Sequence, residues 1–318
     1  MRKVLGMALF TLLLAGFLAW QAGESFLTTY NLKNLARLIA FLSILAIGEA
    51  IVIICGGIDL SVGSIVGYSA MLVVYLIGTR GVPAPLAAAL TLGLGTFVGL
   101  AQGLMITRLR LQPFIVTLGG MMTLRGLAQV LNSGGAVGIG PGHGGFQAVG
   151  GGFVLGIVPG PAVVLAGVLL AGGVMMHATV AGRYVYAIGA NEEAARFSGI
   201  SVDRYKTLAF TLCGALAGLT GVLYAGYLSS VQPSFGGAME LHAIAAAVLG
   251  GCSLRGGEGT ILGVLVGATL MRLITNGINL LGISTYWEYV IVGGVILLAA
   301  VLDVAVQRRT EGQSPPAA

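Results

Sequence analysis

The ionisable side chains inside apolar segments are the residues of this sequence best suited to chemistry. Glu49, Arg125 and Arg272 lie within long apolar stretches, and Asp59 directly follows one of them. A charge in lipid is costly, so such residues usually pair with one another or line a path for ions or polar solutes. Glu49, Asp59 and Arg125 together would suit an ion or proton relay, although no two acidic residues lie close enough in sequence to indicate a coupling pair.

The sequence lacks the motifs of P-loop ATP hydrolysis, of serine hydrolases and of zinc peptidases. The lysines are Lys3, Lys33 and Lys206, and none follows a glycine, so the P-loop mechanism of ATP hydrolysis is excluded. There is neither a G-x-S-x-G nucleophile elbow nor an H-E-x-x-H zinc motif. The histidines are far apart, and the cysteines form no C-x-x-C pair. We therefore expect no enzyme, no catalytic residue, no metal and no cofactor bound by this chain.

The composition indicates the class of protein. Of 318 residues, 57% are hydrophobic and 8% are charged, and the mean hydropathy is +0.97, whereas soluble domains carry about 25% charged residues. The 53 glycines follow no three-residue period, which excludes collagen. The net charge of +5 comes from basic residues dispersed over short loops, which argues against nucleic-acid binding. These values predict an all-α polytopic protein of the lipid bilayer.

Apolar stretches of about 20 residues locate the expected membrane spans. The sequence predicts about ten of them, the eighth being short. They are expected at 4–22, 36–55, 60–79, 84–107, 113–131, 161–179, 207–228, 240–252, 260–281 and 287–306. We expect one transmembrane domain over residues 1–309 and a disordered tail over 310–318.

The distribution of Lys and Arg orients these spans. Most basic residues fall on the side that holds Arg2 and Lys3, which is therefore cytoplasmic, as are both termini. Two connections exceed the length of a hairpin. The outer one, about 132–159, is rich in glycine, and the inner one, 180–206, carries charges of both signs.

Two distant segments share a pattern that predicts a two-half internal repeat. In residues 56–67 and 250–263, an apolar span ends in Gly-Gly, a polar residue and Leu follow, and the next span begins with small residues at every fourth position. Related halves with Gly-interrupted segments at matching positions point to a transport pathway. The pathway candidates from these segments are Gly56, Gly57, Asp59, Ser61, Gly250 and Gly251. Chance similarity in a glycine-rich chain remains the alternative, as does helix capping for Asp59.

Small residues four apart recur elsewhere in the expected spans. Gly63 and Gly67, for example, are followed by similar sets in later spans. The full set comprises Gly63/Gly67, Gly95/Gly99/Gly103, Gly214/Gly218 and Gly259/Gly263/Gly267. Such pairs let helix backbones approach closely in lipid, so they predict packing rather than chemistry.

The inner connection contains a predicted short helix over about 190–199. Asn191 is a suitable N-cap, acidic residues follow it, and Gly199 suits the helix end. Ala194 and Ala195 beside Phe197 would present a compact knob to a partner, although an ordinary solvated connector is the alternative. The candidate coupling residues are Asn191, Glu192, Glu193, Ala194, Ala195, Arg196, Ser198 and Gly199.

These segments together resemble the membrane permease subunit of ribose-type ABC sugar importers. The similarity is carried by G-G-I-D-L-S-V-G at 56–63, Q-P-F-I-V-T-L-G at 112–119, the inner segment 183–200, and the segment from Glu240 to Gly251. The resemblance adds Gln112 and Phe114 to the pathway candidates. The sequence departs from the family at His242, where Asp is usual, and at Glu258, where Arg or Lys is common.

The resemblance implies a division of labour among several chains. Two permease copies, expected to be a homodimer, would form the pathway in a bacterial inner membrane. A separate cytoplasmic ATPase, holding ATP and Mg²⁺, would dock on the 190–199 helix, and an extracytoplasmic binding protein would deliver a monosaccharide such as ribose, xylose or galactose. The alternative is an ion-coupled secondary transporter of a small polar solute, which dependence on ATP or on an ion gradient would distinguish.

Overall fold

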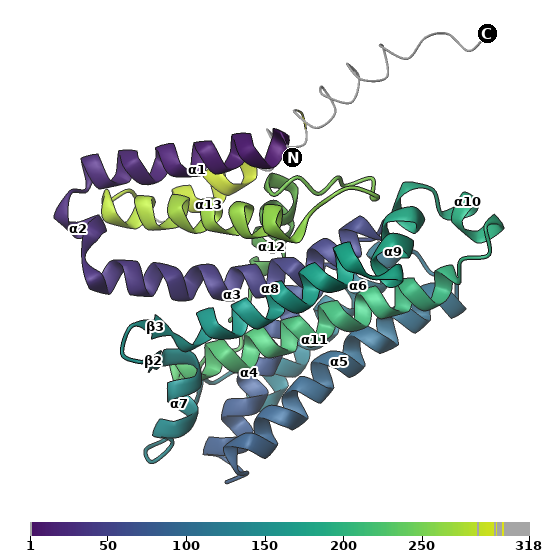
Figure 1. Cartoon of the computed structure of the whole chain (residues 1–318). Helices are drawn as coiled ribbons and strands as arrows, with labels where there is room; N and C mark the ends of the chain where they lie inside the picture. Colours follow the sequence, from purple (N-terminus) through teal and green to yellow (C-terminus); the bar gives the residue numbers. More distant parts are fainter. Residues whose placement is uncertain (1, 285, 296, 298–300, 302–318) are drawn as a thin grey trace.

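Long apolar helices form the structure, which is a computed structural model describing residues 2–284, 286–295, 297 and 301 (Figure 1). Among the described residues, seven helices are long and apolar enough to cross a membrane. They are α1 (Arg2–Gln21), α3 (Thr29–Ile54), α5 (Ala84–Arg108), α6 (Pro113–Leu131), α8 (Gly160–Ala178), α11 (Val202–Leu228) and α13 (Ile261–Leu280). Two shorter apolar helices are α4 (Val62–Gly78) and α12 (Met239–Leu249). The chain is thus an all-α polytopic membrane protein.

The positions of these helices follow the apolar pattern of the sequence. Each expected span from 4–22 to 260–281 overlaps one of them, including the short eighth, although α3 and α11 begin several residues earlier than expected. The tenth expected span, 287–306, runs into residues outside the described ones, so the count of about ten is not established. The expected tail, 310–318, lies wholly outside the described residues.

The outer connection contains structure that the sequence did not predict. Within residues 132–159 lie helix α7 (Gly144–Gly151) and strands β1 (Val137–Gly138), β2 (Phe153–Val154) and β3 (Val158–Pro159). β1 pairs antiparallel with β4 (Ser230–Val231), and β2 pairs antiparallel with β3. Glycine has a low helix propensity, so α7 depends on packing. A Cβ on Gly150 would lie 2.0 Å from the carbonyl oxygen of Leu223 in α11, which shows how closely the two helices approach.

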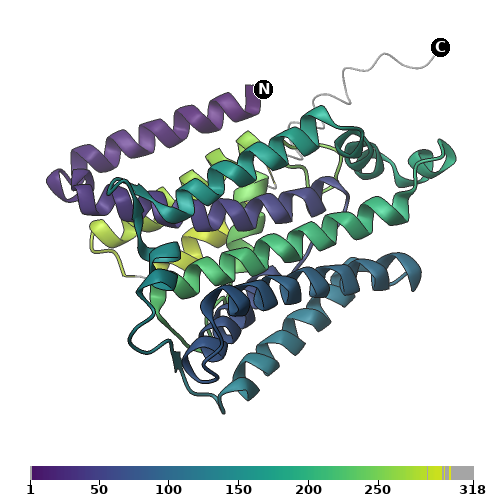
Figure 2. The ribbon, with the colours of Figure 1, turned by 60° about the horizontal axis from the view of Figure 1, so that its bottom comes forward.

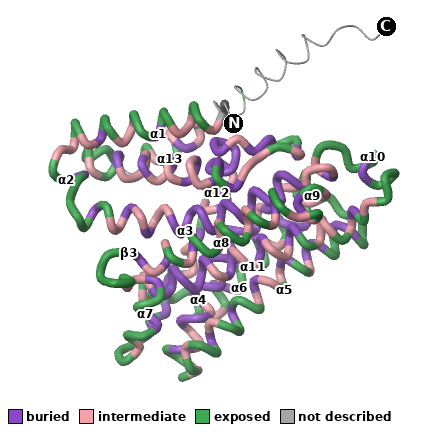
Figure 3. The backbone as a smooth tube through the Cα atoms, in the orientation of Figure 1, coloured by how far each residue is buried: buried purple, intermediate pink, exposed green. Residues whose placement is uncertain are grey.

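The core surrounds α3 and α11. Residues 40–55 of the chain are all buried, and α11 lies between α3 and α5 (Figure 2). Buried residues are concentrated on these central helices, whereas the residues of α1 are largely exposed (Figure 3). At one end of the bundle lie α2 (Glu24–Leu27), α7 and the β2–β3 hairpin. At the other end lie α9 (Val180–Ala190) and α10 (Glu192–Phe197) (Figure 1).

Glycines set the helix crossings, as the sequence predicted. A Cβ on Gly99 of α5 would lie 2.2 Å from the carbonyl oxygen of Phe210 in α11. The same would hold for Gly267 of α13 against the Ala246 carbonyl of α12, at 2.0 Å, whereas Gly67 of α4 faces the Phe235 carbonyl in the loop before α12, at 2.1 Å. Distances this short exclude any side chain at these positions, so the packing interpretation of the glycines is confirmed.

Candidate functional site

The inner segment forms the expected short helix, α10. Asn191 caps it, its side-chain oxygen accepting the N–H of Ala194 at 2.9 Å. Glu192 and Glu193 occupy the first turn, where the helix dipole favours negative charge. The chain leaves through Gly199, whose φ of +81° favours glycine, and the Ser198 hydroxyl donates to the Ala194 carbonyl at 2.9 Å. The sequence did not predict the preceding helix, α9.

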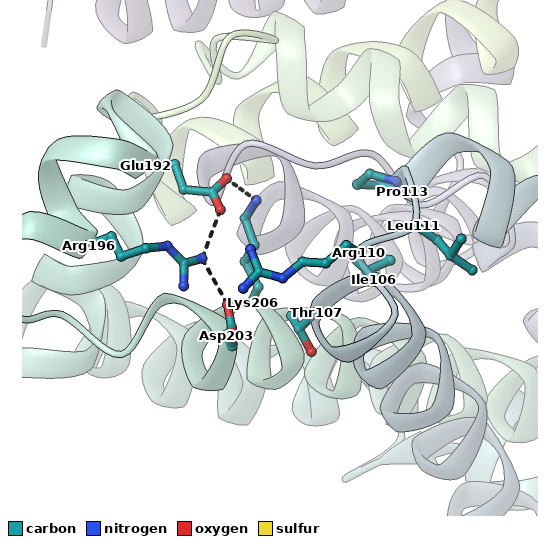
Figure 4. Close-up of a pocket in the computed structure, with 9 residues that line it drawn as sticks. All are labelled: Ile106, Thr107, Arg110, Leu111, Pro113, Glu192, Arg196, Asp203 and Lys206. Carbon is teal, nitrogen blue, oxygen red and sulfur yellow. Dashed lines mark hydrogen bonds and ion pairs between the residues drawn. The ribbon is translucent and has the colours of Figure 1, made fainter.

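Ion pairs fasten α10 to the start of α11. Arg196 contacts Asp203 at 2.9 Å and Glu192 at 3.4 Å, and Lys206 pairs with the other oxygen of Glu192 (Figure 4). Partial burial acts to raise the pKa of Glu192, but the bonds from Lys206 and Arg196 bring that pKa below its usual value. The bond with Asp203 raises the pKa of Arg196. The charges therefore persist at neutral pH and give α10 a defined orientation.

The exposed surface of α10 differs from the expected one. Ala195 is 4% exposed and packs inward, so it supports the helix instead of contributing to a knob. Phe197 is 89% exposed, and Glu193 and Ala194 are exposed as well. A phenylalanine held this far into solvent on a fixed helix is suited to anchor a partner protein.

The first Gly-Gly segment ends α3 in a tight reversal. Gly56 has a φ of +84° and is exposed, whereas Asp59 and Ser61 are fully buried. Asp59 Oδ1 accepts two hydrogen bonds from Ser61, one from the backbone N–H at 2.8 Å and one from the side-chain hydroxyl at 2.6 Å. This local turn positions the start of α4. Asp59 does not cap the helix itself, because the N-cap is Ser61 and no side chain among the described residues accepts the first N–H groups of α4. A pathway role for these residues stays a prediction.

A buried polar network extends from this turn across three helices. Asp59 donates its backbone N–H to Glu49 Oε1 of α3 at 3.1 Å, and the side chain of Gln102 in α5 bonds with the Ser61 hydroxyl at 2.9 Å. The thiol of Cys213 in α11 donates to Glu49 Oε2 at 3.9 Å. Sequence reasoning singled out Glu49 as a charge within a span but missed Gln102 and Cys213, which carry no sequence signal of their own.

The second Gly-Gly segment ends α12 in a similar way. Gly251 has a φ of +92°, and a Cβ on Gly250 would lie 2.5 Å from the Gly263 carbonyl at the start of α13. By contrast, Gln112 and Phe114 are exposed at the start of α6. The side chain of Gln112 forms no hydrogen bond with either Gly-Gly segment within the described chain.

The two Gly-Gly segments and the inner connection meet at Gly189 in α9. The N–H of Gly257, which follows α12, donates to the carbonyl oxygen of Ile54 in α3 at 2.9 Å. A Cβ on Gly189 would lie 1.8 Å from that oxygen and 2.5 Å from the Gly257 nitrogen. Helix α9, which leads directly into α10, is therefore closely packed against both Gly-Gly segments.

Arg125 and Arg272, the other ionisable residues singled out within the expected spans, have separate partners. Arg125 of α6 contacts Glu240 of α12 at 2.7 Å, and Arg272 donates to the Tyr224 hydroxyl at 3.3 Å. Arg125 is therefore joined to Glu240 and not to Glu49 or Asp59, so the three do not form the continuous relay that an ion-coupled mechanism would use.

The two positions that depart from the resembled family lie apart. His242 of α12 lies 3.5 Å from Glu288. Glu258 is exposed in the loop between α12 and α13. Of these two residues, His242 thus lies within the bundle and Glu258 at its surface.

Comparisons with known proteins give a consistent result. Residues 31–300 match the family described as the branched-chain amino acid transport system / permease component. The chain is 42% identical over 281 residues to the ribose import permease protein RbsC of Escherichia coli K12, covering 88% of this chain and 87% of that protein. It is 45% identical over 281 residues to RbsC of Bacillus subtilis, covering 88% and 86%.

A further relative differs in its named sugar. The chain is 33% identical, over an alignment 352 positions long, to the xylose transport system permease protein XylH of E. coli K12, covering 92% of this chain and 90% of that protein. No solved structure matches this chain.

Proposed function

Because this chain belongs to the family of branched-chain amino acid transport system permease components, we propose that it is the membrane permease subunit of an ATP-driven importer for a monosaccharide. Its relatives named for ribose and xylose, matched over most of both chains, support a sugar as the substrate. The chain is a transport component and not an enzyme in itself.

The single observation that carries coupling to an ATPase is the geometry of α10. This helix stands at one end of the bundle, fixed by Arg196, Glu192, Asp203 and Lys206, with Phe197 89% exposed. A rigid helix with an exposed aromatic anchor suits insertion into a groove of a partner. That partner is a separate cytoplasmic ATPase, which binds ATP and Mg²⁺. The end that carries α10 is therefore the cytoplasmic side.

This orientation extends to the rest of the assembly. Both termini lie in the cytoplasm of a bacterium, whose inner membrane the chain spans about ten times. The opposite end, with α2, α7 and the β2–β3 hairpin, receives sugar from an extracytoplasmic binding protein. A second copy of the chain completes the pathway, which the Gly-interrupted segments of the two repeated halves line.

The junction at Gly189 offers a route from α10 to the pathway. α9 ends where α10 begins, and Gly189 contacts both Ile54 and Gly257. A displacement of α10 when the ATPase closes is passed through close-packed backbone to both Gly-Gly segments, which biases the pathway between inward- and outward-facing states.

Gentle purification of the tagged chain from its native membrane tests this function. We expect a stoichiometric ATPase subunit to purify with it. A chain that purifies alone, and that transports solute in vesicles on an ion gradient without ATP, would contradict the proposal in favour of an ion-coupled transporter.

A further inference from the structure

A small pocket opens beside α10, between the α5–α6 connection and the start of α11 (Figure 4). Its volume is about 170 Å³, which is below the 300–1,000 Å³ typical of sites for small molecules. It is large enough for the end of a single side chain. The lining residues are Ile106, Thr107, Arg110, Leu111, Pro113, Glu192, Arg196, Asp203 and Lys206.

The charges of the pocket leave one cation without a partner. Glu192 and Asp203, its two carboxylates, are both engaged by Arg196, and Lys206 also binds Glu192. Arg110 is exposed and forms no hydrogen bond or ion pair with any residue that the structure describes. Its guanidinium reaches from the α5–α6 connection toward Lys206 (Figure 4). The lining thus has three basic groups for two acidic ones.

The backbone holds Arg110 in an unusual conformation. Its φ is +58°, in the left-handed region that residues other than Gly, Asn and Asp seldom adopt. The residue stands in the short connection between the end of α5 at Arg108 and the start of α6 at Pro113. This turn brings the side chain of Arg110 to the mouth of the pocket beside α10.

We propose that this pocket receives a carboxylate side chain of the cytoplasmic ATPase and that Arg110 binds it. The inference rests on the proposed function, since it assigns a second contact to the surface on which α10 docks. A guanidinium presents parallel N–H donors that match a carboxylate, and a partly enclosed site strengthens such a pair. The ATPase would then be held at two points, Phe197 on α10 and Arg110 on the α5–α6 connection, which fixes its orientation.

Charge reversal at Arg110 tests the assignment. The affinity of the purified ATPase for the purified full-length permease is measured in detergent at low and high salt. We expect Arg110→Glu to weaken binding at least tenfold at low salt and to reduce its salt dependence. Arg110→Lys, which keeps the charge but not the paired donors, is expected to fall between Arg110→Glu and the wild type.

Arg108→Glu is the matched control, because it makes the same charge change two residues away without lining the pocket. Binding by Arg108→Glu within about twofold of the wild type, together with the tenfold loss in Arg110→Glu, supports the inference. Equal weakening of ATPase binding by both variants would show that only the overall electrostatic field of the surface matters. That result would overturn the inference. Failure of the wild-type permease to bind the ATPase would instead contradict the proposed function.

A membrane lipid is the other occupant that the test distinguishes. The binding measurement is repeated in nanodiscs of phosphatidylcholine alone and in nanodiscs that also contain phosphatidylglycerol. A loss in Arg110→Glu of the same size in detergent and in both lipids supports a carboxylate of the ATPase. A loss that appears only with phosphatidylglycerol would show that Arg110 binds lipid headgroups, and would overturn the inference.

Discussion

The backbone N–H of Gly257 donates a hydrogen bond to the carbonyl oxygen of Ile54 at 2.9 Å, which joins the loop after α12 to the end of α3. The contact links segments about 200 residues apart in sequence, and Gly189 of α9 packs directly against it. The helix that precedes α10 thus touches both Gly-Gly segments at one point. We expect a movement of α10 that displaces α9 to be felt at this contact.

A methyl group at Gly189 tests the importance of this junction. In Gly189→Ala the Cβ would lie 1.8 Å from the Ile54 carbonyl oxygen, so α9 must move away from α3. We expect sugar uptake to fall at least tenfold at equal abundance in the membrane. Gly173→Ala in α8, whose Cβ would meet nothing within 4 Å, is the control and should transport normally. Normal uptake by Gly189→Ala would show that coupling does not depend on this contact.

The crossing of α5 and α11 predicts a stability difference between two glycines of one helix. Gly99→Ala places a Cβ 2.2 Å from the Phe210 carbonyl, whereas the Cβ of Gly93→Ala meets nothing within 4 Å. Overpacking of this kind destabilises by about 1–3 kcal/mol. We expect a lower unfolding temperature in detergent for Gly99→Ala only. Equal unfolding temperatures for the two variants would contradict the close approach of the helices.

Two buried serines, of which only one is hydrogen-bonded, distinguish the stability that comes from the hydrogen-bond network from the effect of burial alone. Ser61 bonds with Asp59 and Gln102, whereas the Ser43 hydroxyl is buried without a hydrogen-bond partner among the described residues. Loss of the Ser61 hydroxyl leaves buried partners unsatisfied, so Ser61→Ala should cost about 1–3 kcal/mol of stability. Ser43→Ala should be neutral or stabilising in the same thermal unfolding measurement. A smaller loss for Ser61→Ala than for Ser43→Ala would argue against the network.

The exposed ring on α10 predicts a defect in coupling without a defect in folding. Phe197→Ala removes an anchor that makes little contact with the described part of the chain, since the residue is 89% exposed. We expect ATPase binding to weaken about tenfold or more while the unfolding temperature is unchanged.

Tyr30→Ala is a suitable comparison for Phe197→Ala. Tyr30 is an aromatic residue that is 81% exposed at the far end of α3. It should bind the ATPase like the wild type. Undiminished binding by Phe197→Ala would remove α10 from the docking surface.

Local features of the sequence were sufficient to place most helices. The apolar stretches located the spans up to 260–281, and Asn191 with Gly199 marked the beginning and end of α10. The small residues around Gly63 and Gly99 predicted close crossings because a short side chain has that effect in any membrane helix. These features depend on residues that lie within one or two helical turns of one another.

Features that depend on the three-dimensional fold could not be predicted in this way. Ala195 is 4% exposed and belongs to the buried core, so its part in an exposed knob was an incorrect expectation. The bond between Ser61 and Gln102 joins residues 41 apart. Helix α7 is rich in glycine and takes its stability from contact with α11.

Reconstitution tests ATP-driven sugar import most directly. The permease, its ATPase and its binding protein are placed in proteoliposomes, and uptake of radiolabelled ribose and xylose is followed with and without ATP in the absence of any ion gradient. We expect uptake of at least one of the sugars that requires ATP and is lost when the ATPase is omitted. Uptake that proceeds without ATP and only on an imposed proton or sodium gradient would contradict the proposed function.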